Sequence, residues 1–383
     1  MNYFFELLQI AVGHRSELSG IPTEEEWETI MDLAAKQSLI AIAFAGLEKL
    51  PQQQWPSKQV LREWLGQSHV IDLRNKLTSE VCQSLCKQFE EDGFKVCVLK
   101  GQANHAYYPT SLANRRSCGD IDLWVVPENE KSKNASIKRV IEYCRDKYGL
   151  KGLCHLHANL PKIKDVPVEI HFYPSFMNEP IRNRRFQSFF DSIDRCLTIK
   201  DSEGYEIPAM AVEYDAIYQI NHIYRHLIDE GVGLRQVLDY YFLLNSFYSS
   251  VVEKSDWQIA VHDTFHTIEW LGMRRFAGAL MYVLKEVFGL EEEKMLCVPN
   301  ERDGRFLLSE IMIAGNFGQS DPRMSDLAND GSRLRYQLSR TWRRIKRNLR
   351  FLTSYPGEVI FEPIARACHF SWKQVTVLRM SGQ

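Results

Sequence analysis

The chain has 383 residues and a formal net charge of −2, and 45% of its residues are hydrophobic. This length allows two or three domains, and this composition is ordinary for a globular protein. A nearly neutral chain has no global field that attracts nucleic acid, so any such attraction must be local. No segment reaches about 18 uninterrupted apolar residues, which excludes a membrane-spanning helix.

The N-terminus and the cysteines indicate the compartment. The first residues carry no basic leader, and Glu6 interrupts their apolar run, so we expect no signal peptide. The nine cysteines form no Cys-x-x-Cys pair, and several lie in apolar runs. This usage is typical of free thiols in a reducing compartment. We therefore expect a cytoplasmic protein.

The first 90 residues are predicted to be helical. Thr23, with Glu26 three residues on, has the pattern of a helix-capping box, and apolar residues then follow at helical spacing up to Pro51. A second, longer helix is predicted from about residue 58 to residue 91, where Asp92-Gly93 supplies a stop.

Strand-like runs then alternate with shorter helices. The hairpin of the last two predicted strands is closed by residues 161–165. Residues 174–211 show no clear period. In chain order the predicted elements are a strand at 94–100, a short helix beginning near Gln102, a loop at 109–119, a strand at 120–126, a helix at 129–147, and strands at 152–160 and 166–173.

The remainder is predicted to be helical from about residue 212 to residue 288 and loop-rich over 297–332. Residues 333–350 contain eight Arg or Lys residues and no acid. The apolar members of this stretch recur at spacings of three and four and are Leu334, Leu338, Trp342, Ile345 and Leu349. The pattern predicts a basic amphipathic helix. Such a helix binds an anionic membrane surface or a phosphate-rich partner, or it packs by its apolar stripe and leaves a solvated basic face.

Two acids open the strand at 120–126. Asp120 and Asp122 are two residues apart, so both carboxylates point to one side of the strand while Ile121 and Leu123 face a core. Neighbouring carboxylates repel each other and need a cation between them. Mg²⁺ prefers such oxygen ligands and usually also holds substrate phosphates. The pair therefore predicts a metal-dependent phosphate-handling site, although an isolated Asp-x-Asp also suits a solvated strand edge.

A third acid follows on a later strand, where Glu169 and His171 share a face. The order of strand, glycine turn, helix, strand with Asp-x-Asp and strand with a lone acid resembles the polymerase-beta-type nucleotidyltransferase superfamily, with Gly101 at the turn. The sequence motifs LKG…GDIDLWV…VEIH and, further on, HxxxH…GLRxxxD are similar to those of an uncharacterised bacterial nucleotidyltransferase-like family, which is often found near cell-surface polysaccharide genes. The resemblance covers residues 80–245 well and the rest loosely.

The resemblance implies an α+β fold with a mixed-sheet nucleotidyltransferase core at 81–200. An N-terminal helical region at 1–80 and a C-terminal helical domain at 201–383 would flank this core. The implied reaction moves a nucleoside monophosphate from an NTP such as ATP to an unknown hydroxyl or phosphate acceptor, and a role in cell-surface polysaccharide metabolism is among those it suggests.

The implied site assigns a role to each matching residue. Asp120, Asp122 and Glu169 would hold Mg²⁺, or Mn²⁺ in its place, and Glu169 would also be the candidate base. The expected nucleotide-binding residues are Lys100, Gly101, Gln102, Arg116 and His171. Gln102 departs from the family pattern, because Ser or Gly is preferred at that position.

Two other functions stay open. One is a non-catalytic scaffold that keeps the fold, peripheral at the inner membrane through residues 333–350, which Gln102 favours and the intact acids oppose. The other is a toxin-like transferase that modifies tRNA or protein. The histidine pairs allow two interpretations, although a structural role is favoured for each: His155 and His157 share a strand face, while His222 with His226, and His262 with His266, have the helical spacing of zinc ligands.

Overall fold

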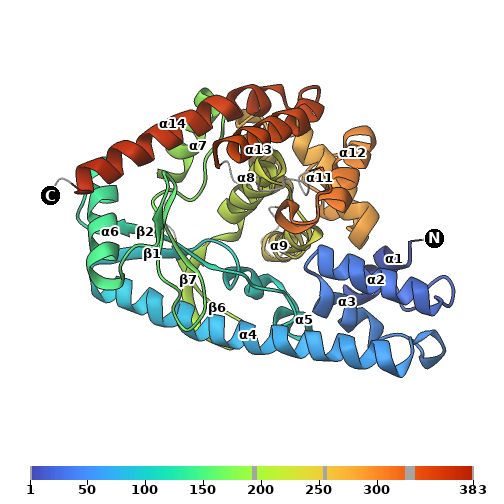
Figure 1. Cartoon of the computed structure of the whole chain (residues 1–383). Helices are drawn as coiled ribbons and strands as arrows, with labels where there is room; N and C mark the ends of the chain where they lie inside the picture. The colour runs from blue at the N-terminus through green and yellow to red at the C-terminus, as the bar shows by residue number, and fades with distance from the viewer. Residues whose placement is uncertain (1, 192–195, 253–256, 324–332, 382–383) are drawn as a thin grey trace. The chain divides into compact units, whose positions relative to one another are not determined.

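A computed structural model describes residues 2–191, 196–252, 257–323 and 333–381 (Figure 1). The chain forms two compact units. The first, here called the helical unit, comprises Met1–His69 and Gln219–Glu362, and the second, the sheet unit, comprises Val70–Tyr218 and Pro363–Gln383.

The helical unit is built from amphipathic helices around a core of leucine, isoleucine and aromatic side chains. Thr23 forms the predicted capping box with Glu26. Its helices are α1 (Tyr3–Ala11), α2 (Glu24–Lys36), α3 (Ile40–Leu47), the start of α4 (Lys58–Glu91), most of α8 (Val212–Asp229), α9 (Leu234–Val252), α10 (Trp257–Trp270), α11 (Arg274–Phe288), α12 (Glu301–Ala314), α13 (Arg333–Asn348) and the start of α14 (Pro356–Ser381).

Two features of this unit differ from the prediction. The helix expected to continue to Pro51 divides between α2 and α3, where Ser38 has a positive φ of 56°. The stretch 297–332 was predicted to be loop-rich, yet α12 lies within it. Asn300 caps α12, and Gly304 lies inside it because an added Cβ would meet the Tyr282 ring.

The sheet unit contains one seven-stranded mixed sheet in the order β3-β4-β5-β2-β1-β7-β6. The pairs β1–β7 and β2–β5 are parallel, and the other four are antiparallel. The strands are β1 (Phe94–Val98), β2 (Ile121–Pro127), β3 (Gly152–Leu153), β4 (His157–Asn159), β5 (Val168–His171), β6 (Cys196–Lys200) and β7 (Glu206–Met210).

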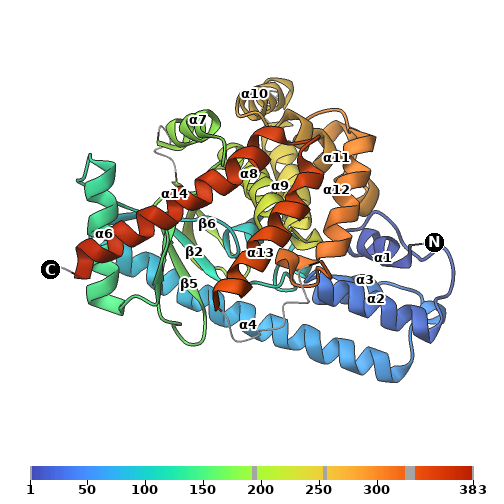
Figure 2. The same cartoon turned by 45° about the horizontal axis from the view of Figure 1, so that its top comes forward.

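One face of the sheet carries the core. Alternate residues of β1, β2 and β5 pack there against the second half of α4 and against α6 (Lys133–Tyr148). The end of α14 lies beside α6 in both views (Figures 1 and 2). The helices predicted at 58–91 and 129–147 are confirmed, although α6 begins four residues later than predicted. The opposite face of the sheet carries the polar side chains of β2 and β5.

The least regular part of the sequence is also ordered. Residues 174–211 contain α7 (Pro180–Asp191) and the antiparallel pair β6 and β7. The prediction found none of these elements. The α+β mixed-sheet fold is confirmed. Within the described part of the chain, no helix combines the length and hydropathy that crossing a bilayer requires.

Candidate active site

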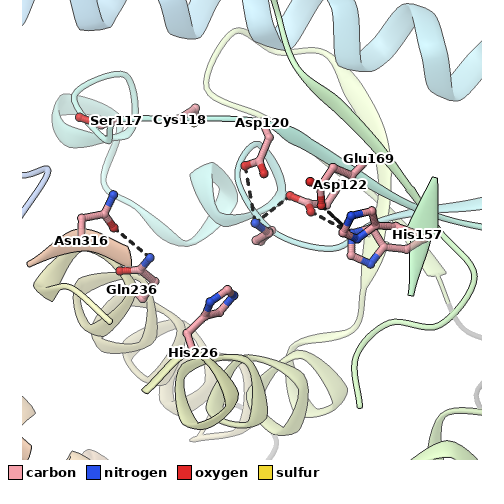
Figure 3. Close-up of polar contacts among 12 residues, drawn as sticks. Ser117, Cys118, Asp120, Asp122, His157, Glu169, His226, Gln236 and Asn316 are labelled. Carbon is pink, nitrogen blue, oxygen red and sulfur yellow. Dashed lines mark hydrogen bonds and ion pairs between the residues drawn. The ribbon is translucent and has the colours of Figure 1, made fainter. Parts of the chain in front are cut away.

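Strand pairing brings the three predicted carboxylates together. Asp122 lies in β2 and is the register partner of Glu169 in the parallel neighbour β5, while Asp120 directly precedes β2. Ile121 and Leu123 are fully buried on the core face, so the acids point to the opposite face. Carboxylate oxygens of the three acids lie within 4.8 Å of one another. Figure 3 shows them converging.

A lysine stands between the paired aspartates. The Nζ atom of Lys100 lies 2.9 Å from Asp122 Oδ2 and 3.6 Å from Asp120 Oδ1. Burial lowers the pKa of Lys100, but the charges of Asp120, Asp122 and Glu169 outweigh burial and raise it. Lys100 therefore remains an ammonium ion at neutral pH. It supplies positive charge where the sequence pattern required a cation.

Two histidines complete the charge balance. Nε2 of His171 lies 3.0 Å from Asp122 Oδ1 and 3.5 Å from Glu169 Oε2, and Nδ1 of His157 lies 3.2 Å from the same glutamate oxygen. Burial raises the pKa of Asp122, but Lys100 and His171 outweigh that effect, so the pKa is lowered. Burial likewise opposes ionisation of Glu169, and the hydrogen bond from His171 and the charge of His157 still lower its pKa. Both carboxylates are therefore ionised at neutral pH.

The glycine turn follows β1. Gly101 has a φ of +64°, a conformation that favours glycine, and a short 3-10 helix (Ala103–Tyr107) follows in place of the predicted short helix. The Gln102 side chain is fully buried, and neither of its amide atoms has a hydrogen-bond partner among the described residues. Gln102, the residue that differs from the family pattern, is therefore buried inside the protein.

The loop before β2 is held by a residue that the sequence interpretation missed. Asn75 of α4 is buried, donates to the carbonyl oxygens of Asn114 at 2.7 Å and Arg116 at 2.8 Å, and accepts from Cys118 N at 3.3 Å. Arg116, expected at the nucleotide, is itself buried and donates to Cys118 Sγ at 3.2 Å. Nε2 of His105 also lies 3.3 Å from that sulfur.

His157 is the other residue near the acids that the sequence did not assign to the site. It reaches Glu169 because β4 and β5 pair antiparallel with His157 opposite His171. The only signal in the sequence was the shared face of His155 and His157, and it does not reveal the pairing partner.

A cavity opens on the same face of the sheet, further along β1 and β2. Its volume is about 870 Å³, and its lining includes Cys97, Trp124, Lys133, Phe190 and Asp191. Trp124 follows Asp122 by two residues and so points to the same side of β2. The cavity is large enough for a small-molecule ligand.

The two histidine pairs of the helical unit differ in their surroundings. His222 and His226 are largely buried in α8, and Nδ1 of His226 lies 2.8 Å from Glu230 Oε1. Within the described residues, the groups with metal-ligand geometry include neither this pair nor the pair of α10, His262 and His266. The burial of His222 and His226 supports the structural role favoured for that pair. The core role favoured for the α10 pair is wrong, because His262 and His266 are both exposed and, among the described residues, His262 forms an ion pair only with its neighbour Asp263.

Comparison with known families decides the identity of the chain. A family described as an uncharacterised nucleotidyltransferase matches residues 23–289, which is well over half of the sequence. The chain belongs to this family. No curated protein and no solved structure matches it. The predicted family resemblance is confirmed, and the mixed sheet fits the polymerase-beta-like core of such enzymes.

Membership makes the chain a nucleotidyltransferase, and therefore an enzyme that uses a nucleoside triphosphate. Nucleotidyltransferases generally depend on divalent metal ions, and the donor set here fits one. Asp120, Asp122 and Glu169 offer hard oxygen ligands from a single face, and two cationic side chains, Lys100 and His171, lie against them. The candidate site thus gathers three carboxylates where a divalent cation can bind them.

Proposed function

We propose that this enzyme transfers a nucleoside monophosphate from a Mg²⁺-bound NTP to a hydroxyl or phosphate acceptor. The observation that carries the proposal is the convergence of Asp120, Asp122 and Glu169 within 4.8 Å on the polar face of the sheet. Lys100, within ion-pair distance of both aspartates, supplies a neighbouring positive charge. Family membership supports nucleotidyl transfer in general.

The three acids would hold the metal ion. Bound Mg²⁺ would shield phosphate charge and lower the pKa of the attacking hydroxyl. The alternating pattern of β2 and β5 keeps the carboxylates on one face with little freedom, since the intervening residues are locked in the core. This rigid placement orients the nucleotide for in-line attack.

The chain's own residues supply the remaining chemistry. Glu169 is ionised at neutral pH and takes the proton of the acceptor hydroxyl. The acceptor oxygen forms a bond to the α-phosphorus, the bond to the bridging oxygen breaks, and pyrophosphate leaves. Lys100 keeps its charge and can turn from the aspartates to a phosphate oxygen, where it neutralises the leaving group.

The cavity beside Trp124 is our candidate for the acceptor or base subsite. It lies on the same sheet face as the acids, and its lining combines aromatic and charged side chains. A ligand bound there would change the fluorescence of Trp124. We expect NTP or acceptor binding to alter the tryptophan emission of the wild type but not that of Trp124→Phe. An equal change in both proteins would place the ligand elsewhere.

The proposal is tested by Mg²⁺-dependent NTP binding. Calorimetry with each of the four NTPs and Mg²⁺ should show binding to the wild type and little binding to the double variant Asp120→Ala with Asp122→Ala. Each carboxylate is a direct ligand in the proposal, so its loss should weaken binding at least about tenfold, as the loss of a supporting group at a metal site does.

The control is a pair of acids outside the site. Glu142→Gln with Asp146→Asn on α6 changes the net charge by the same amount, and Asp146 is largely exposed. This variant should bind Mg²⁺-NTP like the wild type. If the Asp120 and Asp122 double variant also binds like the wild type, the proposed site is wrong. In a separate experiment, transfer of labelled nucleotide to a co-purifying molecule would identify the acceptor.

A second candidate function, binding to an anionic membrane surface, rests on the exposed face of α13. Trp342 is 66% exposed and Leu349, which follows α13, is 54% exposed, so these members of the predicted apolar stripe do not pack. Leu334 and Leu338 lie outside the residues whose side chains are described. Arg347 is instead buried and donates to the Ile228 carbonyl at the end of α8. Exposed apolar side chains among Arg and Lys suit an interfacial helix.

Vesicle sedimentation tests this second candidate. Vesicles that contain an anionic lipid should carry down the wild type at low salt, while Trp342→Ala with Leu349→Ala should stay in the supernatant. Ile259→Ala removes an equally exposed apolar side chain from α10 and should sediment like the wild type. Equal sedimentation of all three proteins, or none with any vesicle, would refute the idea.

A further inference from the structure

A second group of metal-ligand atoms lies beside the carboxylates. His157 of β4 is the register partner of His171 in β5, and Glu169 lies two residues before His171 on the same face. One ligand atom from each of these three residues lies within 4.8 Å of the others. Figure 3 shows His157 and Glu169 side by side. The group shares Glu169 with the three-acid set but differs in its two imidazoles.

Two distances within this group match the spacing of ligand atoms around one ion. Both imidazoles approach a single oxygen, Glu169 Oε2, at 3.2 Å from His157 Nδ1 and 3.5 Å from His171 Nε2. Metal–ligand bonds of about 2.0–2.1 Å in a tetrahedron separate neighbouring ligand atoms by roughly 3.3–3.4 Å. The observed separations fall on both sides of that value.

Asp122 supports one member of this group from outside it. Asp122 Oδ1 lies 3.0 Å from His171 Nε2 and so orients that imidazole, while the three ligand atoms of the group come from His157, Glu169 and His171. Asp122 and His171 are 1% and 5% exposed, while His157 and Glu169 are 18% and 27% exposed. The buried half is held by three adjacent strands, and the more open half leaves a path for an ion to enter.

The donor chemistry selects the class of ion. Mg²⁺ and Ca²⁺ prefer oxygen ligands only, whereas imidazole nitrogen suits Zn²⁺ and its neighbours in the first transition row. Surface histidine pairs also bind such ions weakly, but this pair is backed by two carboxylates. Sharing of Glu169 would place the second ion next to the one held by the aspartates, as in two-metal sites.

We propose that His157, His171 and Glu169 bind a zinc-class divalent transition-metal ion, with the fourth position of the tetrahedron taken by water. The site is distinct in donor type from the three-acid magnesium site. The inference concerns metal binding by the folded chain alone and does not need a nucleotide, so it stands or falls separately from the proposed nucleotidyl transfer.

Cobalt is the probe, because four-coordinate Co²⁺ has strong visible absorption that reports its ligands. Full-length protein freed of metal with a chelator is titrated with Co²⁺ alone. We expect one tight equivalent with a four-coordinate spectrum, which Zn²⁺ displaces and excess Mg²⁺ does not. His157→Gln and His171→Gln should each weaken binding at least about tenfold, because loss of even a supporting group at a metal site costs that much.

Two controls separate the outcomes. His262→Gln with His266→Gln removes the histidine pair of α10, in which His262 is 76% exposed, and should leave the Co²⁺ spectrum unchanged. Asp120→Asn should also keep the spectrum while it weakens Mg²⁺-NTP binding, which distinguishes this inference from the proposed function. His157 is partly exposed, so His157→Gln keeps the test informative if His171→Gln does not fold.

Some results would overturn the proposal. One is a wild-type spectrum of octahedral, water-ligated Co²⁺ with no tight equivalent. Another is a titration that His157→Gln leaves unchanged. If the spectrum is lost only in the variant of His262 and His266, the binding belongs to the surface pair of α10 and the proposed site is wrong.

Discussion

Replacement of Lys100 by methionine tests whether this side chain occupies the place of a cation. Methionine is unbranched and only one atom shorter than lysine, and it removes the charge. Asp122, which is 1% exposed, would lose the ammonium group at 2.9 Å and keep only His171 as a close cationic partner. Three carboxylates would then share only the imidazoles of His157 and His171.

The expected cost follows from burial. Removal of one partner of a buried ion pair destabilises a protein by about 3–5 kcal/mol. Lys100 is 16% exposed, and His171 remains, so we expect a cost at or just below the lower end of this range, about 2–3 kcal/mol. A loss of 1 kcal/mol lowers the melting temperature of a domain of the size of the sheet unit by about 2–4 °C. Lys100→Met should therefore melt about 5–10 °C below the wild type in chelator.

Magnesium should reverse part of this loss. A ligand present at ten times its dissociation constant stabilises the folded state by about 1.4 kcal/mol. The variant offers Mg²⁺ an acid pair without a competing ammonium group, so Mg²⁺ should raise its melting temperature more than that of the wild type. Lys95→Met removes an exposed lysine from β1, the strand that Lys100 follows, and is the matched control. If Lys100→Met melts with the wild type in chelator, or gains no more from Mg²⁺, the reasoning fails.

Three further predictions concern other parts of the molecule. Asn75→Ala leaves two loop carbonyls without their partner, so we expect a loss of about 2–4 kcal/mol in chemical denaturation and faster proteolysis of the loop before β2. Gly101→Ala, at φ +64°, should cost about 1–2 kcal/mol in the same assay, and no loss would contradict a strained turn. The hydrogen bond from Arg275 lowers the pKa of Asp303 against the effect of burial, so this carboxylate stabilises the fold above about pH 4 and the stability is lost as pH falls. Between pH 5 and 3, about one unit either side of the unfolded pKa, the melting temperature of Asp303→Asn should therefore fall less steeply with pH than that of the wild type. An unchanged slope would refute this explanation.

The sequence predicted that the acids share one face of the sheet, because this placement depends on local periodicity. Asp120 and Asp122 alternate with Ile121 and Leu123, and a strand sends such residues to opposite faces. Glu169 needed one more step, a parallel neighbour in register, which the family resemblance supplied. Long amphipathic elements such as α4 were equally accessible, since many residues report the same helical period.

Features that depend on distant partners could not be read in this way. His157 reaches Glu169 only through the register of β4 with β5, and Asn75 meets the loop before β2 across about 40 residues of chain. The edge strand β6 carries exposed side chains on both faces, so it has no apolar alternation to detect. The direction in which the Lys100 side chain turns is set by charge, not by sequence pattern.

The parallel pairing of β2 with β5 also limits how the length of this chain can change. Glu169 stands beside Asp122 through strand register alone, and the connection between the two strands contains α6 and the β3–β4 hairpin. Residues can be added to or removed from the loops of that connection without moving either acid. One residue inserted between Ile121 and Asp122, or inside β5, would turn a carboxylate into the apolar core. We expect insertions and deletions among relatives to fall between residues 128 and 167 and to spare both strands.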